Sequence, residues 1–415
     1  MNLLAIPGSQ RKGKETDTNR KEGKKMFNEE TCSLCGICLS ECPFMEMPED
    51  LAQEEIGRMI ETKQSDVAVN NCGSCGYCNT ICPMDSNPFD LIREIKVKHN
   101  DEAGTGGMFL TSEDVPFNLF SMALEYESEE KEKGIKKYSD PPKSSDMFHA
   151  GCSLPHVFPE LAKTSLLERY PIVGGMKYCC GGYVLDSFGE EEAKIKGKDL
   201  LMKFQDLGIK RLITLCPGCD LLIGGEYPKL IEDFDIETMA FTDYFIERHR
   251  RGELKLVNQI NKRVAFHDPC AWRGLDSKIY DSPREFLQTL GVEVVEMEHN
   301  RENSLCCGFP RNPNIPPLLS EQVAARRVSE AKQQGAEAIA VTCVGCLNIS
   351  PKAAEMGIDT FHVIELAQMA IGETPAHCIN ETLGNTMGVV MKKIGENPNI
   401  MTDRYVARNG KIQRV

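Results

Sequence analysis

The 415-residue sequence predicts a mixed α/β protein, with an N-terminal helical module followed by two copies of one α/β unit. Two observations predict this fold class. Of the 19 cysteines, 18 fall into two sets of four and two sets of five with regular spacing. Around the two later sets, apolar residues recur with helical and then strand periodicity. The boundaries we expect are an arm at 1–26, the helical module at 27–100, a linker at 101–146, α/β units at 147–260 and 261–371, and an extension at 372–415.

Composition excludes several classes of protein. The chain has 48 basic and 62 acidic residues, a net charge of −14, which disfavours nucleic acid or an anionic membrane surface as the main partner. No apolar run reaches the roughly 18 residues of a membrane span. The apolar stretch Met1 to Pro7 precedes basic residues, the reverse order of a secretory signal. We therefore expect a cytoplasmic protein without its own transmembrane segment, peripheral to a membrane only through a partner.

The first two cysteine sets have the spacing C-x2-C-x2-C-x3-C-P. In bacterial-type ferredoxins the first three cysteines of such a run bind one cubane 4Fe-4S cluster, and the fourth binds the other cluster of the pair. Gly36 and Gly76 lie between ligands, where a side chain would crowd the cluster. Pro43 and Pro83 stop the chain from continuing regularly past the last ligand. The candidate ligands are Cys32, Cys35, Cys38 and Cys82 for cluster one, and Cys72, Cys75, Cys78 and Cys42 for cluster two.

Structural zinc is the alternative for these eight cysteines. Zinc takes two C-x2-C pairs per ion, so the eight could hold two ions. The compact four-cysteine run with its proline occurs twice, which favours iron–sulfur clusters. Between the runs, Pro48 to Thr62 has an apolar face formed by Leu51, Ile56, Met59 and Ile60 and predicts a helix. We therefore expect the helical variety of ferredoxin module rather than the small β-hairpin variety.

The two sets of five cysteines are copies of one pattern, which is a single cysteine, a Cys-Cys-Gly and a C-x2-C. In both copies 35 residues separate the Cys-Cys pair from the C-x2-C pair. A helix with an apolar face ends at Gly208 in the first copy and at Gly335 in the second. A short buried strand follows each glycine, at Ile209 to Leu215 and at Ala336 to Thr342. The ten cysteines are Cys152, Cys179, Cys180, Cys216 and Cys219, then Cys270, Cys306, Cys307, Cys343 and Cys346.

Strands also precede the first cysteine of each copy, at Met147 to Gly151 and at Arg263 to His267. Ligand sites in open α/β sheets lie at the carboxyl ends of the strands, so the five cysteines of a copy should meet there. The copies differ in their first gap, which is 26 residues in the first and 35 in the second. Spacing alone leaves a zinc or disulfide site open beside a cluster with more than four thiolates. We favour the cluster, because five cysteines exceed the four ligands of zinc.

These two copies resemble the cysteine-rich CCG domain of heterodisulfide reductase catalytic subunits. The spacing of that family, roughly C-x31–39-C-C-x35–36-C-x2-C, is met in full by the second copy and by the first except in its short first gap. The segment His267-Asp268-Pro269-Cys270 is also similar, as are the residues that follow it, Arg273, Tyr280, Pro283 and Arg284. With the ferredoxin module in front, the layout from about Cys32 to Met369 resembles the D-type subunit, or the C and B subunits joined.

This resemblance implies an activity. In that family, each complete motif binds a non-cubane 4Fe-4S cluster through its five cysteines, and a disulfide is reduced between the two clusters. The ten cysteines of the copies are thus the implied catalytic residues, and two cubane clusters supply electrons. Relatives with the same layout also serve as electron-relay subunits of larger complexes, and this alternative stays open.

The expected partners follow from the absence of nucleotide-binding motifs in the sequence and from the family resemblance. No G-x-G-x-x-G run or P-loop is visible, so we expect no nucleotide to bind this chain. The implied partner is a flavoprotein electron-transfer subunit, soluble or membrane-linked. A thiol or disulfide is the implied substrate, and its identity is left open.

Three histidines flank the cysteines. His267 could protonate a leaving thiolate or hydrogen-bond the Asp-Pro turn beside it, and we favour the turn. His149 and His156 carry weaker signals. Trp272, the single tryptophan, is expected to serve in packing, and Cys378 to be an ordinary thiol.

Four cations also lie close to the cysteines in sequence, namely Arg273, Arg284, Arg311 and Lys177. They could clamp an anionic substrate or offset the charge of thiolates and clusters, and we favour the second role.

Three polar or terminal stretches complete the chain. We expect residues 11–25 to be disordered and the charge run from Glu127 to Lys137 to be a solvated linker that ends at Asp140 to Asp146. The segment from Gly372 to Val415 is expected to pack as a helix or to dock a partner.

Overall fold

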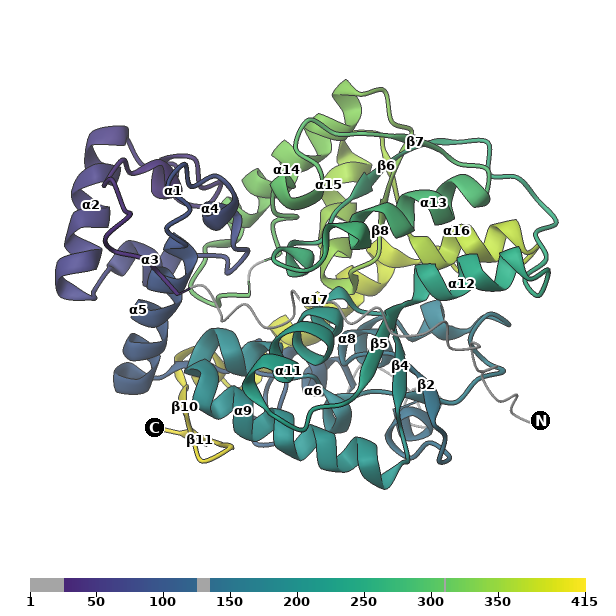
Figure 1. Ribbon diagram of the computed structural model, residues 1–415, viewed down its shortest axis with the longest axis horizontal. Coiled ribbons are helices and arrows are strands. Elements are labelled where there is room, and N and C mark those ends of the chain that lie inside the picture. The colour runs from purple at the N-terminus through teal and green to yellow at the C-terminus, as the bar shows by residue number, and fades with distance from the viewer. Residues whose placement is uncertain (1–25, 125–134, 310) are drawn as a thin grey trace.

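The computed structural model describes residues 26–124, 135–309 and 311–415. The expected arm, apart from Met26, and most of the charge run from Glu127 lie outside these residues. The described chain has the mixed α/β architecture that the sequence predicts. Figure 1 shows a helical N-terminal module at one end of the molecule and two units with parallel sheets beside it.

The N-terminal module consists of helices, and the described residues 26–103 contain no strand. Helix α2 confirms the helix expected after Pro48. Its buried residues Ala52, Ile56 and Met59 pack with Leu91 and Ile95 in one small core. The helices are α1 (Ile37–Ser40), α2 (Glu49–Thr62), α3 (Asp66–Asn71), α4 (Tyr77–Thr80) and α5 (Pro88–Ala103).

Two glycines begin the short helices that carry cysteine ligands. Gly36 and Gly76 have φ values of 74° and 71°, a left-handed conformation that glycine adopts without strain. A Cβ on Gly36 would also lie 2.8 Å from the backbone of Ala52, whereas one on Gly76 would meet only Phe89 at 3.8 Å. The glycines therefore serve the backbone turn, and Gly36 also allows α2 to approach.

Each α/β unit contains one four-stranded parallel sheet, and the strand order is the same in both. The first sheet has the order β3-β2-β4-β5 and the second β7-β6-β8-β9. The four strands that the sequence predicts are the inner two of each sheet. The strands are β2 (Asp146–His149), β3 (Ile172–Val173), β4 (Arg211–Thr214) and β5 (Glu237–Ala240), then β6 (Arg263–His267), β7 (Glu293–Val295), β8 (Ala338–Val341) and β9 (Asp359–His362).

The predicted helix of each copy is also present, as α9 (Gly182–Asp206) and α14 (Pro317–Gln333). Each is followed by a glycine with positive φ, Gly208 and Gly335. The other helical segments of the first unit are α8 (Ser153–Val157), η2 (Pro159–Ala162), η3 (Met176–Tyr178), α10 (Pro217–Cys219), η4 (Asp220–Glu226), α11 (Tyr227–Leu230) and α12 (Phe241–Arg250). Those of the second unit are η5 (Cys270–Trp272), η6 (Ser277–Tyr280), α13 (Asp281–Thr289), η7 (Arg301–Asn303), η8 (Val344–Ile349), α15 (Ser350–Glu355) and α16 (Val363–Ala370).

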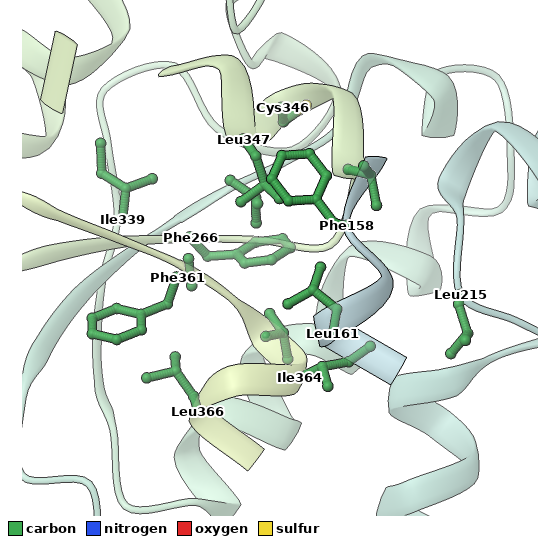
Figure 2. Close-up of a cluster of buried hydrophobic side chains, with 14 of the residues drawn as sticks. Phe158, Leu161, Leu215, Phe266, Ile339, Cys346, Leu347, Phe361, Ile364 and Leu366 are labelled. Atoms are coloured by element: carbon green, nitrogen blue, oxygen red, sulfur yellow. The ribbon is translucent and has the colours of Figure 1, made fainter. Parts of the chain in front are cut away.

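The two units share one hydrophobic core. Phe158 and Leu161 of the first unit belong to the same buried cluster as Phe266, Leu347 and Ile364 of the second (Figure 2). The outer face of the first sheet has a separate core against α9. Because apolar burial holds the units together, their cysteine loops have a fixed relative position.

The segment 101–146, expected as a linker, is packed in the part that the structure describes. Leu110, Val115, Phe120 and Met122 are buried. Its elements are β1 (Thr105–Gly106) and α6 (Leu119–Leu124). Phe120 joins the core of the two units, but the partners of Leu110, Val115 and Met122 include residues at the far end of the chain, which local sequence does not indicate.

The C-terminal extension supplies those partners. Tyr405 and Ile412 pack against Leu110 and Val115, and Val390 packs against Met122. Strands β10 and β11 form an antiparallel sheet with β1. The extension consists of α17 (Ile379–Glu396), α18 (Asn399–Thr402), β10 (Arg404–Arg408) and β11 (Lys411–Arg414). Across the described chain, no helix combines the length and apolar character needed to span a bilayer.

Candidate metal centres

The eight cysteines of the N-terminal module form two groups that cross between the runs. In the first group, burial raises the pKa of Cys38 to about 12, and the charges of the other three thiols add to it. In the second, burial and neighbouring thiols raise the pKa values of Cys42 and Cys78. The groups are Cys32, Cys35, Cys38 and Cys82, and Cys72, Cys75, Cys78 and Cys42. The fourth cysteine of each run therefore joins the other run, as the spacing predicts.

A buried lysine, not singled out in the sequence, lies beside the second group. The Lys96 ammonium donates to Ser74 Oγ at 2.6 Å and to the Cys72 carbonyl at 3.4 Å. The side chain is only 7% exposed. A buried cation is stable where anionic thiolates compensate it, and its charge opposes the rise that burial causes in the pKa of Cys72. A lysine among the apolar positions of α5 is the sequence signal that points to it.

The five cysteines of the first unit come together at the carboxyl ends of its strands. Neighbouring thiols interact in series, from Cys152 through Cys179 and Cys180 to Cys219 and Cys216. The Cys152 and Cys180 thiols hold the pKa of Cys179 well below its usual range, and the Lys196 ammonium acts in the same direction. The arrangement is the one expected from strand order, and it favours thiolate at Cys179.

The second unit also brings its cysteines together, with Cys307 next to Cys306 and Cys346, and Cys346 next to Cys343. The Cys306 and Cys346 thiols hold the pKa of Cys307 well below its usual range. Cys270 lies beside them, and burial raises its pKa to about 12 although Arg311 and Arg273 act against the rise.

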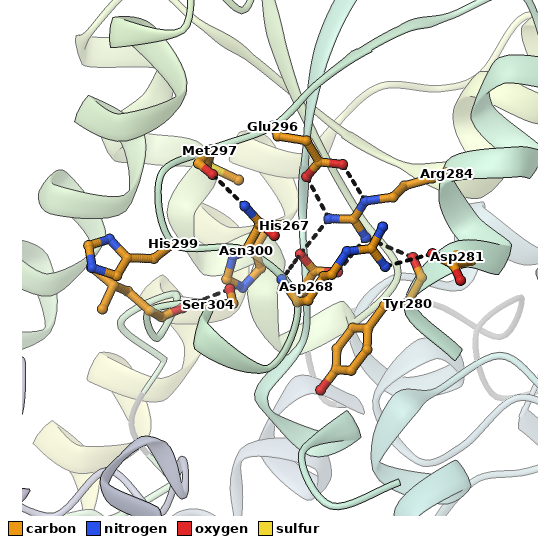
Figure 3. A network of polar contacts seen from close by, with 12 residues as sticks. His267, Asp268, Tyr280, Asp281, Arg284, Glu296, Met297, His299, Asn300 and Ser304 are labelled. Carbon is orange, nitrogen blue, oxygen red and sulfur yellow. Dashed lines mark hydrogen bonds and ion pairs between the residues drawn. The ribbon is translucent and has the colours of Figure 1, made fainter. Parts of the chain in front are cut away.

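His267 does not bond the Asp-Pro turn, and that expectation is wrong. Its Nδ1 accepts from Arg327 Nε at 3.0 Å, and its ring lies near the Cys307 sulfur. The Asp268 carboxylate instead accepts two bonds from Arg284, at 2.7 and 2.8 Å (Figure 3). The ion pair with Arg284 outcompetes the neutral ring for Asp268 because both of its groups are charged and buried.

The four cations that the sequence places near the cysteines have different partners in the structure. Arg284 is held by Asp268 and Glu296, so it has no free face for a substrate. Arg273 donates to the Cys75 carbonyl at 2.5 Å and to the Glu302 carbonyl at 2.9 Å, joining the N-terminal module to the second unit.

Arg311 joins the N-terminal module to both units, because it pairs with Asp186 at 3.0 Å and donates to the Ser74 carbonyl. Lys177 is exposed and donates to the Ser139 carbonyl at 3.0 Å. The charges of Arg273 and Arg311 act on Cys270, in line with the charge-offset role.

Trp272 is packed, as expected, but it also connects the two units. Its Nε1 donates to Asp220 Oδ2 at 3.0 Å, and Thr214 donates to the same carboxylate. Burial raises the pKa of Asp220 to about 7. The sequence interpretation missed Asp220, although an acid directly after Cys219 stands where the second copy has Leu347.

The other flanking residues have local partners. His149 is buried, and its Nε2 bonds the Tyr178 carbonyl at 3.0 Å. His156 Nδ1 bonds the Cys152 carbonyl at 2.8 Å. Cys378 lines a small pocket together with His377 and Glu365. None of the three is positioned by these contacts as a sixth ligand.

The two five-cysteine groups fit a bound cluster. Gly218 and Gly345 occupy the same place in the two C-x2-C loops, and a Cβ on either would lie 3.7 Å from a cysteine sulfur. The buried atoms His149 Nδ1 and Arg327 Nη2 have no hydrogen-bond partner. Soft thiolates as the sole ligand type suit iron–sulfur chemistry. When bound, such a group supplies one-electron transfer.

A cleft of about 280 Å³ lies beside the first group. Its walls include Met176 and Lys177 before the Cys-Cys pair, Tyr183 after it, and Lys196, with the β10–β11 hairpin on the far side. Burial raises the pKa of Tyr183, and the charge of Cys179 adds to this. A small molecule in this cleft would be close to the first group of thiols.

The family comparisons agree with this arrangement. Residues 147–224 and 264–349 match the model of the cysteine-rich CCG domain, and residues 24–83 match a 4Fe-4S dicluster domain. A segment that matches a dicluster domain thus precedes two segments that match the CCG family.

Three relatives are named as oxidoreductases or as a subunit of one. The probable iron-sulfur-binding oxidoreductase FadF of Bacillus subtilis is 30% identical over 41% of this chain and 25% of the relative. The D subunit of the dihydromethanophenazine:CoB–CoM heterodisulfide reductase of Methanosarcina mazei is 27% identical over 49% of the chain and 52% of the relative. The EtfAB:quinone oxidoreductase of Syntrophomonas wolfei is 25% identical over 48% of the chain and 29% of the relative. The matched region spans about half of these relatives or less.

Among solved structures, a putative Asp/Glu racemase from Yersinia pestis aligns with 58% of this chain and 99% of its own, at a TM-score of 0.30 and 10% identity. A likeness at this level carries no functional argument.

Proposed function

We propose that this chain is an iron–sulfur subunit that passes electrons from two cubane clusters to two non-cubane 4Fe-4S clusters, where a disulfide is reduced or a dithiol oxidised. The observation that carries the proposal is the assembly of two complete five-thiol groups at equivalent sheet edges, next to a dicluster module. The ligands are the eight N-terminal cysteines and the ten cysteines of the two α/β units.

The proposal includes the domain division expected from the sequence. The helices of the N-terminal module support the helical variety of ferredoxin at 27–100, and the two sheets support CCG domains at 147–260 and 261–371. Residues 1–26 and 372–415 flank them, and 101–146 connects them.

The contacts support an order of electron transfer. Cys75 of the second N-terminal group acts electrostatically on both Cys270 and Cys306. Arg273 also bonds the Cys75 carbonyl directly. We therefore place the route as cluster one, cluster two, second unit, first unit, with the Asp220–Trp272 bond at the last step.

The chemistry explains why two centres are needed. Reduction of a disulfide takes two electrons, and iron–sulfur clusters deliver one at a time. In the proposal each sulfur of the substrate is held at one of the two five-thiol groups, and the shared core of the units fixes their separation. The cleft beside Tyr183 and Lys196 supports access of a small thiol from the first unit.

The electron donor in this proposal is a flavoprotein subunit, because the relatives include an EtfAB:quinone oxidoreductase and subunits of multi-subunit reductases. Location in the cytoplasm, or at a membrane through that partner, belongs to the same proposal.

One observation favours a second function, electron relay without a substrate. Arg284, a buried arginine beside the second unit's site, is paired with Asp268 and Glu296. Arg273 donates to backbone carbonyls. Neither is therefore free to clamp an anionic substrate.

The deciding experiment is iron and acid-labile sulfide analysis with low-temperature EPR on anaerobically purified protein. About sixteen irons and a new paramagnetic signal when the oxidised protein is titrated with a thiol support disulfide chemistry. About sixteen irons without that signal, and no turnover of a disulfide panel with a reduced dye, support relay. About eight irons would contradict clusters in both units, and zinc in their place would establish structural sites.

A further inference from the structure

Behind Cys307 lies a buried arginine on α14, which the proposed electron route does not use. The Arg327 side chain is 0% exposed. Its Nε donates to His267 Nδ1 at 3.0 Å, and its Nη1 donates to Glu330 at 2.5 Å and to the His299 carbonyl at 2.6 Å. These bonds hold the guanidinium in one orientation against the imidazole ring.

This contact selects the tautomer of His267. A guanidinium only donates hydrogen bonds, so the nitrogen that faces it, Nδ1, must carry the lone pair. A ring nitrogen that accepts a hydrogen bond carries no proton, so the ring proton of His267 is on Nε2. A ring nitrogen of His267 and the sulfurs of Cys307 and Cys346 lie within 4.8 Å of one another. The Nε2–H group is therefore the donor available to the Cys307 sulfur.

The first unit lacks this arrangement. His149 occupies the equivalent place at the end of β2, but its Nε2 bonds the Tyr178 carbonyl at 3.0 Å. Because a carbonyl only accepts, the ring proton faces the backbone, and the Nδ1 lone pair has no partner. When the Cys-Cys pairs are aligned, the position of Arg327 holds Leu200, a buried apolar side chain.

We infer that Arg327 and His267 are positioning residues for the second unit's centre: Arg327 holds the ring so that Nε2–H donates to the Cys307 thiolate, raising the reduction potential of the cluster there. The inference rests on the proposed function, which puts an iron–sulfur cluster on these cysteines. Hydrogen bonds to cluster sulfurs are one of the main determinants of potential, because they stabilise the more negative, reduced state. The first unit's cluster receives no such bond from His149.

The test is an EPR-monitored redox titration of the full chain, with iron counted in each variant. His267→Leu removes the donor and is expected to shift the one-electron reduction equilibrium of the second unit's cluster about tenfold toward the oxidised form, a midpoint about 59 mV lower. His267→Gln keeps an amide N–H and should recover part of the shift. Arg327→Leu, which installs the residue of the first unit, should lower the midpoint in the same direction.

His149→Leu is the matched control, and it should leave the midpoint of the second unit's cluster unchanged. An unchanged midpoint in His267→Leu at about sixteen irons would overturn this inference alone. Loss of about four irons in His267→Gln would identify the histidine as a ligand and overturn it as well. About eight irons in the wild-type chain would overturn the proposed function and this inference together. If Arg327→Leu does not fold, the two His267 variants still test whether His267 raises the midpoint of the second unit's cluster.

Discussion

The two α/β units have the same strand order and the same five-cysteine pattern, yet polar residues surround the cysteines differently. In the first unit His149 bonds a backbone carbonyl, and the buried Leu200 stands at the position of Arg327. In the second, Arg327 contacts His267, and Arg284 pairs with the buried Asp268. The difference teaches that one fold can keep a ligand geometry while changing the electrostatic environment of the centre.

The largest expected effect tests whether the two units are separate centres. Cys180→Ala and Cys307→Ala each remove a ligand from one unit, so each should abolish the non-cubane EPR signal of its own unit. The cubane signals of the N-terminal module should persist, because its eight cysteines group separately. EPR of reduced protein measures both. Loss of the cubane signals in either variant would contradict independent modules.

The next largest effect is expected from a change to the buried ion pair of the second unit, between Arg284 and Asp268. Arg284→Met leaves Asp268, which is 0% exposed, without its charged partner. We expect a loss of about 3–5 kcal/mol of unfolding free energy, because an uncompensated buried carboxylate is costly. Denaturant unfolding of the protein measures it. The matched control is Arg211→Met in the first unit, whose partner Asp146 is 16% exposed, and it should cost less. Equal losses would contradict the contrast in burial.

Loss of the hydrogen bond between Trp272 and Asp220, which joins the two units, should have an intermediate effect on the unfolding free energy. Trp272→Phe keeps the packing with Phe266 but removes the donor to Asp220, at an expected cost of about 1–3 kcal/mol. Trp272→Phe combined with Asp220→Leu, the residue of the second copy, should recover much of the loss because no buried carboxylate remains. Denaturant unfolding measures both variants. If the double variant has a lower unfolding free energy than Trp272→Phe alone, the two residues are not coupled.

The smallest effect is expected at a surface contact between the same units. Arg250 and Glu285 form an ion pair, but both side chains are about half exposed. Glu285→Gln should change the unfolding free energy by less than about 1 kcal/mol, and high salt should remove the difference. A salt-independent loss of several kcal/mol would show that this pair, rather than the shared core, holds the units together.

Much of the site could be predicted from the sequence because the signals are local. Four-cysteine runs, glycines that end helices and short buried strands act over a few residues, so the groups of four and five thiols follow from spacing and strand order. The repeat shows the same pattern a second time, and this located β4 and β8 correctly.

The rest was decided by contacts between distant segments. The expected linker is packed because Leu110 and Val115 meet Tyr405 and Ile412, almost 300 residues away. Arg327 reaches His267, and Asp220 reaches Trp272, across 60 and 52 positions. Such pairs leave no periodic signal. The sequence by itself therefore determined the fold class and which cysteines come together, through local spacing. Only the tertiary structure decided which buried charges and hydrogen bonds surround each centre, because burial and partner geometry arise when the whole chain packs.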